Sequence, residues 1–218
     1  MRGASASGCR SSTDGSMADK PARLIAVDGV DGRALARLAR AARAIANGGR
    51  RRRGGISRWD ASGLFEELMA ANDEAGVPST RTLLLVYAAD LVFRLRWQIR
   101  PALAEGKSVV AAPYVDSAVA FGRAAGIPAG WLTNLFRFAP KPDAIEHAFR
   151  VSTRVSKRPA EPVGFVELGC GLASATAPGF TQSQLLDRAR EHLRVASRRA
   201  TGVAPGPRRA RAGSVRRS

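Results

Sequence analysis

Short apolar runs alternate along this chain with longer segments in which apolar residues recur at helical spacing. One run covers Leu24–Val27 and ends in an Asp-Gly pair, and a second covers Ser108–Ala112. Short runs of this kind are typical of strands buried on both faces of a sheet. A further strand is predicted at Ala144–Ser152.

The segments between these runs carry apolar residues three and four positions apart, which predicts amphipathic helices. They cover Ala34–Ala46, Ser62–Asn72, Pro78–Ile99, a loop and helix over Pro113–Phe121, a helix that opens at Ile127–Pro128, and a last helix from Phe180 or Thr181 to about Ala196. Strands that alternate with helices favour a parallel sheet covered on both faces. The predicted fold class is therefore α/β, with three layers.

The length of 218 residues fits one such domain with tails. We expect the domain to cover residues 21–196, preceded by a disordered extension over residues 1–20 and followed by a disordered basic tail over residues 197–218. Residues 154–179 are rich in Pro, Gly, Ser and Ala, which predicts a mobile flap within the domain. Met17 is as good a start as Met1.

The net charge of +17 is concentrated in two places. Residues 194–218 contain eight Arg and no acidic residue, and Arg50–Arg53 adds four more. The remainder of residues 21–193 is nearly balanced, with 20 basic and 16 acidic side chains. Nucleic acid is therefore a candidate partner of the two Arg-rich segments, and a solvated charged surface is the alternative.

The cysteine spacing, the histidine spacing and the hydropathy of the chain argue against a disulfide-linked, a metal-binding and a membrane-spanning protein. Cys9 and Cys170 lie far apart, which argues against a structural disulfide and fits a reducing compartment. We expect Cys170 to be a passive thiol, with an exposed thiol as the alternative. His147 and His192 have no partners at metal-ligand spacing, so no metal site is predicted. No run approaches 18 apolar residues and no secretory signal is evident, so a cytoplasmic protein without a membrane span is expected.

The segment from Arg23 to Arg37 reads as a strand, a glycine turn and a helix, which is the layout of a phosphate-binding loop. In such a loop, backbone N–H groups of the turn and of the helix N-terminus point at an anion. The loop also needs a lysine for the β- and γ-phosphates and a Ser or Thr hydroxyl for Mg²⁺. Leu35 and Ala36 stand at those two positions. The sequence therefore predicts the backbone layout of a triphosphate site without the lysine and the hydroxyl that such a site needs.

Five segments agree, in order, with motifs of one known family. Val27–Gly32 is similar to F-E-G-x-D-G before A-G-K-T, Arg51–Gly55 to R-E-P-G-G, Leu84–Asp90 to L-L-F-A-A-D-R, Ile99–Lys107 to I-x-P-A-L-x-x-G, and Tyr114–Phe121 to D-R-Y-x-x-S-x-x-A-Y-Q. In these motifs the chain resembles thymidylate kinase, a nucleoside monophosphate kinase. The resemblance implies a P-loop NTPase-type fold, ATP and Mg²⁺ as cofactors, and a homodimer formed through helices.

The resemblance also implies the nucleotide-binding candidates. Tyr87 matches the aromatic residue that stacks on thymine, and Tyr114 and Ser117 match positions that line the monophosphate site. The loop contributes Asp28, Gly29, Gly32 and Arg33. The alternative for Tyr87 is a half-buried aromatic residue. For Tyr114 and Ser117 it is a helix-entry loop in which Ser117 and Asp116 cap the helix. Asp28 and Asp31 are either turn-forming residues or a remnant anion or metal site.

The positions at which the chain departs from the family are those that carry charge. They are Leu35 and Ala36 in the loop, Ala112 and Pro113 for the Asp-Arg pair of D-R-Y, Leu91 for the last residue of A-A-D-R, and Arg52 for the glutamate of R-E-P-G-G. Phosphoryl transfer depends on such cations and on Mg²⁺. Arg33 is no equivalent of the lysine. The sequence therefore predicts a degenerate thymidylate kinase-like pseudoenzyme with no catalytic residues, which still binds nucleotide or has become a partner-binding module. An active kinase of divergent mechanism is the alternative.

Overall fold

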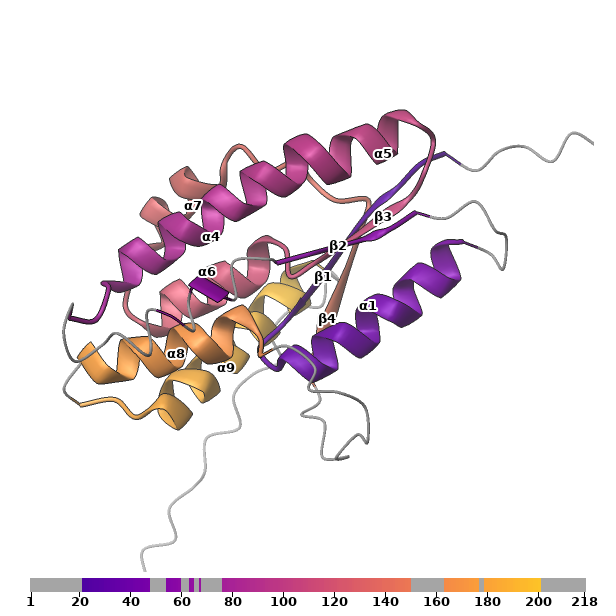
Figure 1. The fold of residues 1–218 in the computed structure, drawn as a ribbon. Helices are drawn as coiled ribbons and strands as arrows, with labels where there is room; N and C mark the ends of the chain where they lie inside the picture. Colours follow the sequence, from indigo (N-terminus) through magenta and orange to yellow (C-terminus); the bar gives the residue numbers. More distant parts are fainter. Residues whose placement is uncertain are drawn as a thin grey trace, which may run out of the picture.

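The computed structural model describes residues 21–47, 54–59, 63, 64, 67, 76–149, 163–176 and 179–200. A four-stranded parallel sheet forms its centre (Figure 1), with the strand order β2-β3-β1-β4. The strands are β1 (Leu24–Gly29), β2 (Ile56–Arg58), β3 (Val109–Ala112) and β4 (Ala144–Ala148). The three predicted strands are confirmed in position, and β2 is an additional strand that the sequence pattern did not predict.

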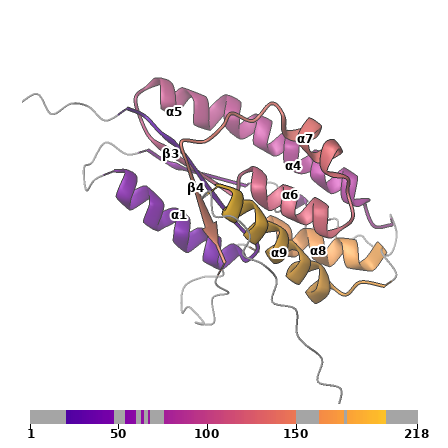
Figure 2. The same cartoon turned by 180° about the vertical axis from the view of Figure 1, so that it is seen from behind.

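Helices cover both faces of this sheet (Figures 1 and 2). Among the described helices, α1 packs on one face, and α6 packs on the other face with the remaining larger helices around it. The helical elements are α1 (Gly32–Ala46), α4 (Thr80–Arg94), a π-helical turn η1 (Leu95–Ile99), α5 (Arg100–Ala104), α6 (Val115–Ala124), α7 (Ala129–Phe136), α8 (Phe165–Thr176) and α9 (Gln182–Ala200).

Alternate residues of β1 enter two separate cores. Leu24 and Ala26 belong to the larger core beneath α4, α6, α8 and α9, whereas Ile25 and Val27 pack beneath α1. This division follows because successive side chains of a strand point to opposite faces of the sheet. The predicted three-layer α/β fold is confirmed.

Part of the segment predicted as a mobile flap is a packed helix. In α8, Phe165, Leu168 and Leu172 are buried in the larger core. Gly169 allows close packing, since a Cβ at this position would lie 3.0 Å from the ring of Phe121. The small residues of α8 therefore permit close helix contact rather than mobility.

Other boundaries differ less from those predicted. Helix α9 continues to Ala200, four residues beyond the predicted end. The predicted helix Ser62–Asn72 lies mostly outside the described residues, as do Arg50–Arg53, residues 1–20 and residues 201–218. Within the described ranges, no helix combines the length and the hydropathy needed to span a bilayer.

Candidate functional site

The connection from β1 to α1 is short. Only Val30 and Asp31 separate the last residue of the strand from Gly32, the first residue of the helix. Asp31 caps the helix, because its Oδ1 accepts a hydrogen bond from the N–H of Ala34 at 2.7 Å. Ala34 stands where the resembling motif has glycine, and alanine favours the helical conformation far more than glycine does. The residues that would wrap around a phosphate are therefore already helical.

A carboxylate of the chain occupies the positive end of α1. Glu167 Oε2 accepts hydrogen bonds from the N–H of Gly32 and from the N–H of Gly164, both at 2.9 Å. The beginning of α8 lies directly against the loop, since a Cβ on Gly164 would come within 3.0 Å of Gly32 N and Cα. A helix N-terminus is a ready anion site. In this structure Asp31 and Glu167 fill it.

The two loop positions that would carry cation and hydroxyl chemistry face apolar surroundings. Leu35 is 7% exposed and belongs to the smaller core between α1 and the sheet. Arg33 is exposed on the surface of α1 and is not among the described residues that line the adjoining pocket. The loop arginine thus lies away from the position that a lysine would occupy.

Four of the candidate residues form one buried polar cluster. The carboxylate of Asp28 accepts hydrogen bonds from the N–H of Tyr114 at 2.9 Å and of Ser117 at 3.0 Å. The hydroxyl of Ser117 accepts from the N–H of Gly29 at 2.9 Å and donates to its carbonyl oxygen at 3.1 Å. Burial, and then the nearby charge of Asp116, raise the pKa of Asp28 from 3.8 to about 6. The cluster fixes the end of β1 to the beginning of α6.

His147, which has no partners at metal-ligand spacing in the sequence, belongs to the edge of this cluster. It lies opposite Asp28 in the pairing of β1 with β4. Its Nε2 is 2.9 Å from Asp116 Oδ2. Its ring also stacks on that of Phe149, with centroids 5.7 Å apart. The parallel pairing of two strands thus brings together residues that are distant in sequence. Within the described part of the chain, no group of three potential ligands could hold a metal ion.

Tyr87 lies in the larger core rather than at a half-exposed position. Its side chain is fully buried, and its hydroxyl donates a hydrogen bond to the carbonyl oxygen of Tyr114. Its ring lies 4.3 Å from the ring of Phe165, measured between centroids. A side chain of the protein therefore occupies the face on which, by the resemblance, a base would stack.

Arg94 is a buried charge that the sequence analysis did not single out. Its Nε donates to Asp90 Oδ2 at 2.6 Å, and its Nη1 donates to the carbonyl oxygen of Pro113 at 3.0 Å. Asp90 and Arg94 stand four positions apart in an otherwise largely apolar helix, and this spacing could have indicated the pair. The arginine links α4 to the carboxyl end of β3.

Glu167 was also missed, although its position follows a known capping pattern. It is the third residue of α8 and its carboxylate bonds to the N–H of Gly164, the residue just before the helix. A glutamate at this position is one half of a capping box. Its second bond, to Gly32, depends on tertiary packing and has no sequence signal.

Cys170 is buried in α8, as expected for a passive thiol, and burial raises its pKa to about 12. Such a thiol carries almost no reactive thiolate near neutral pH.

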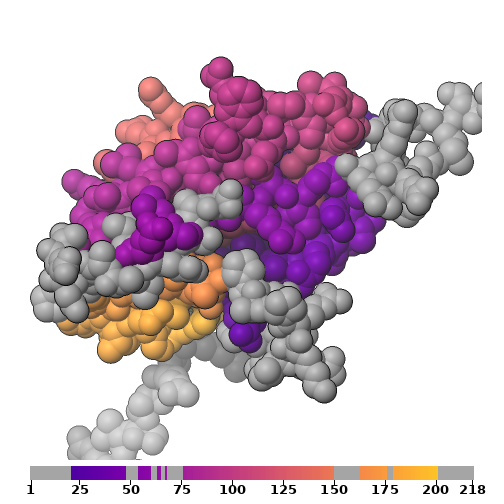
Figure 3. Space-filling model, viewed as in Figure 1, coloured from indigo at the N-terminus to yellow at the C-terminus, as the bar shows by residue number. Residues whose placement is uncertain are grey.

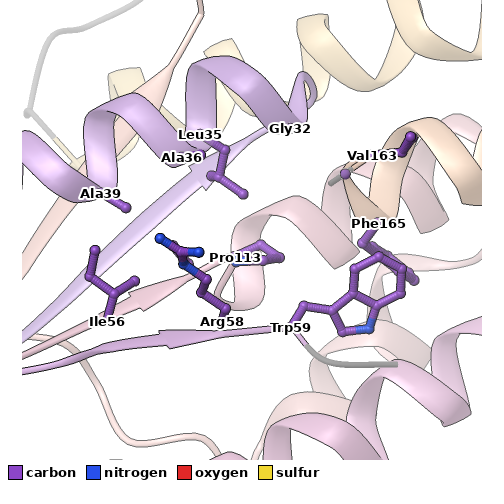
Figure 4. Close-up of a pocket in the computed structure, with 12 residues that line it drawn as sticks. Gly32, Leu35, Ala36, Ala39, Ile56, Arg58, Trp59, Pro113, Val163 and Phe165 are labelled. Atoms are coloured by element: carbon purple, nitrogen blue, oxygen red, sulfur yellow. The ribbon is translucent and has the colours of Figure 1, made fainter. Parts of the chain in front are cut away.

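An open pocket lies at the carboxyl ends of β2 and β3, beside the loop and the beginning of α8 (Figure 4). It is open to solvent, and its cavity volume is about 60 Å³. Arg58 is the one charged residue among the described residues that line it. The lining consists of Gly32, Leu35, Ala36, Ala39, Ile56, Arg58, Trp59, Ala112, Pro113, Val163, Gly164 and Phe165.

Comparison with known proteins relates the chain to one family. No known family profile matches it. It is 41% identical to a probable thymidylate kinase of Pyrococcus horikoshii over 59 residues. This matched segment covers 27% of this chain and 29% of that protein. It is 39% identical to a probable thymidylate kinase of Pyrococcus abyssi over 82 residues. This second matched segment covers 37% of this chain and 40% of that protein. The chain thus spans well under half the length of these curated relatives.

A solved structure shares the fold over most of both chains. The thymidylate kinase from Ehrlichia chaffeensis superposes with a TM-score of 0.54 and covers 83% of this chain and 85% of its own, at 16% sequence identity. At this identity the likeness shows the fold alone.

Proposed function

We propose that this chain, which its matched segments and its fold relate to the thymidylate kinase family, is a pseudoenzyme that does not transfer phosphate. The observation that carries the proposal is the loop itself. Leu35 and Ala36 stand at the cation and hydroxyl positions, and the carboxylate of Glu167 bonds to the N–H of Gly32. A polyphosphate at this helix end would have to displace one carboxylate and lie close to another.

Electrostatics weighs against catalysis. The transferred phosphoryl group is stabilised by a loop lysine, arginines and Mg²⁺, and one such arginine alone is worth about 10³–10⁵ in rate. Arg58 is a single guanidinium and no carboxylate–hydroxyl pair for Mg²⁺ accompanies it in the described pocket. Removal of several such groups together leaves a barrier that positioning alone does not overcome.

The nucleoside half of the site supports the same proposal. A base that stacked on Tyr87 would have to remove Phe165 from the core, where it also contacts Trp59 and Phe121. Retained nucleotide binding is a separate question from retained catalysis, and the two need separate measurements.

The direct test mixes the full chain with ATP, Mg²⁺ and a panel of nucleoside monophosphates and measures ADP release. We expect no release above background. Turnover above about 1 s⁻¹, within the range of kinases, would instead establish the alternative of an active kinase with a divergent mechanism.

Calorimetry with ATP and with thymidine monophosphate tests binding. We expect no heat of binding from either nucleotide with the native chain. Glu167→Gln removes the charge but keeps an oxygen acceptor for Gly32, so it should admit ATP weakly. Glu191→Gln is the matched control, because Glu191 is an exposed partner of Arg194 on α9. Tight ATP binding to the native chain would contradict the role given to Glu167.

Nucleic-acid binding is a second candidate function, and the concentration of arginines in residues 194–218 favours it. Removal of residues 201–218 leaves all described helices in place. If the tail binds the phosphate backbone, the truncation lowers both the affinity for a random duplex and its dependence on salt. An unchanged salt slope would exclude the tail as the binding element.

A further inference from the structure

The pocket beside the loop has a composition unlike that of a phosphate site. Its walls come from α1, the ends of β2 and β3, and the beginning of α8, and they are formed by apolar side chains and glycine backbone apart from Arg58. The carboxyl ends of parallel strands are where ligands bind in open α/β sheets.

Arg58 is positioned to reach a ligand in this pocket. It is the last residue of β2 and lies opposite Ala112 of β3 in the sheet. Figure 4 shows its guanidinium between Ile56 and Pro113, directed toward α1. Its side chain is exposed, and no ion pair or hydrogen bond joins it to another residue of the described ranges. A guanidinium stays ionised at all physiological pH values and pairs well with a planar carboxylate.

The lining selects a ligand with one negative charge and an apolar body. Leu35, Ile56, Trp59, Val163 and Phe165 offer apolar contact, and Arg58 offers a single fork of donors. A polyphosphate is disfavoured here, because Glu167 lies at the adjacent helix end and Arg58 is the one cation among the described residues that line the space.

We propose that this pocket binds a small apolar monocarboxylate, with its carboxylate on Arg58 and its body against Leu35, Ile56 and Trp59. The proposal goes beyond the loss of phosphoryl transfer and holds whether or not the chain retains any kinase activity. It assigns the site a small-molecule ligand of a different chemical class from a nucleotide.

The test titrates octanoate into the full chain by calorimetry and follows the same titration by NMR. Two control ligands separate the contributions to binding. 1-Octanol has the same apolar chain as octanoate but no charge, and ATP is highly charged but has no apolar chain. We expect octanoate to bind and to shift the indole N–H signal of Trp59. Because Arg58 is exposed and exposed ion pairs are worth up to about 1 kcal/mol, Arg58→Gln should weaken octanoate binding by about threefold to fivefold.

Arg96→Gln is the matched control, since Arg96 is an exposed arginine of η1 that does not line the pocket. It should leave octanoate affinity unchanged, and the binding of 1-octanol should not respond to Arg58→Gln. The proposal is overturned if octanoate does not bind at millimolar concentration, if Arg58→Gln and the native chain bind it equally, or if ATP displaces it at lower concentration than octanoate itself binds. A melting temperature for each variant, equal to that of the native chain, establishes that the exposed substitutions leave the fold intact.

Discussion

The rings of Phe165 and Tyr87 pack against each other in a tilted arrangement in the larger core, with centroids 4.3 Å apart and planes inclined at 41°. Phe165 is also in edge contact with Trp59 and Phe121. The first aromatic residue of α8 therefore joins that helix to α4 and α6. This contact makes α8 part of the core rather than a flap.

Phe165→Ala should lower the free energy of unfolding by about 3–5 kcal/mol, because it removes a buried aromatic ring and leaves a cavity. Chemical denaturation measures the change. Phe180→Ala is the matched control: Phe180 is 44% exposed, and its removal should cost less than about 1 kcal/mol. Equal losses for the two variants would contradict the packing role given to Phe165.

Asp28→Asn should change how stability depends on pH. Because burial raises the pKa of Asp28 to about 6, the folded chain holds a proton between about pH 4 and pH 6 that the unfolded chain has released. The stabilisation from this carboxyl is therefore present at low pH and is lost as the pH rises through 6.

Unfolding free energies of the native chain and of Asp28→Asn, measured from pH 4 to pH 7, test this sign. Asparagine does not titrate, so the native value minus the variant value should fall by on the order of 2 kcal/mol over that interval. A constant difference would show that Asp28 titrates normally in the folded chain.

Asp90→Ala should be strongly destabilising, because it leaves the guanidinium of Arg94 buried without its carboxylate. Loss of one partner of a buried ion pair costs about 3–5 kcal/mol. The exposed pair of Asp187 and Arg190 on α9 provides the comparison, and Asp187→Ala should cost less than about 1 kcal/mol. Thermal unfolding of both variants separates the two cases.

Trp97→Glu should disrupt the homodimer that the resemblance implies. Helix α4 and η1, in the magenta upper part of Figure 3, carry four exposed large apolar side chains. They are Leu85, Val92, Phe93 and Trp97. Sedimentation velocity should show a dimer for the native chain and a monomer for Trp97→Glu. Ile45→Glu alters an 81% exposed apolar residue on α1 and should leave the dimer intact; a native monomer would remove the expectation altogether.

The sequence pattern was sufficient for elements with strong periodicity. The run at Leu24–Val27 and the helix after it were predicted because one is continuously apolar and the other repeats at helical spacing. Strand β2 was missed because it has only three residues. Its position depends on Gly54, where a Cβ would lie 1.2 Å from the carbonyl oxygen of Ser108. A close contact between residues distant in sequence produces no periodic pattern of apolar residues.

The candidate site was predictable in part for the same reason. Asp28, Gly29, Tyr114 and Ser117 were selected from motifs and do lie together, although the contacts between them are structural hydrogen bonds. Their role in nucleotide binding stays a prediction. The bond from Glu167 to Gly32 joins residues 135 positions apart, so no local pattern could have indicated it. The small residues of α8 predict mobility by composition, whereas in the structure they allow close packing.

The beginning of α1 at Gly32 has a consequence for any attempt to build a phosphate-binding lysine and threonine into this segment. A lysine at position 35 and a threonine at position 36 would be added to the side of an intact helix, with no backbone ring to present a phosphate to them. Recovery would require residues 32–34 to unwind, which gives up the cap from Asp31 and the bond to Glu167. A phosphate-binding loop of the resembling family would therefore differ from this segment in backbone conformation as well as in side chains.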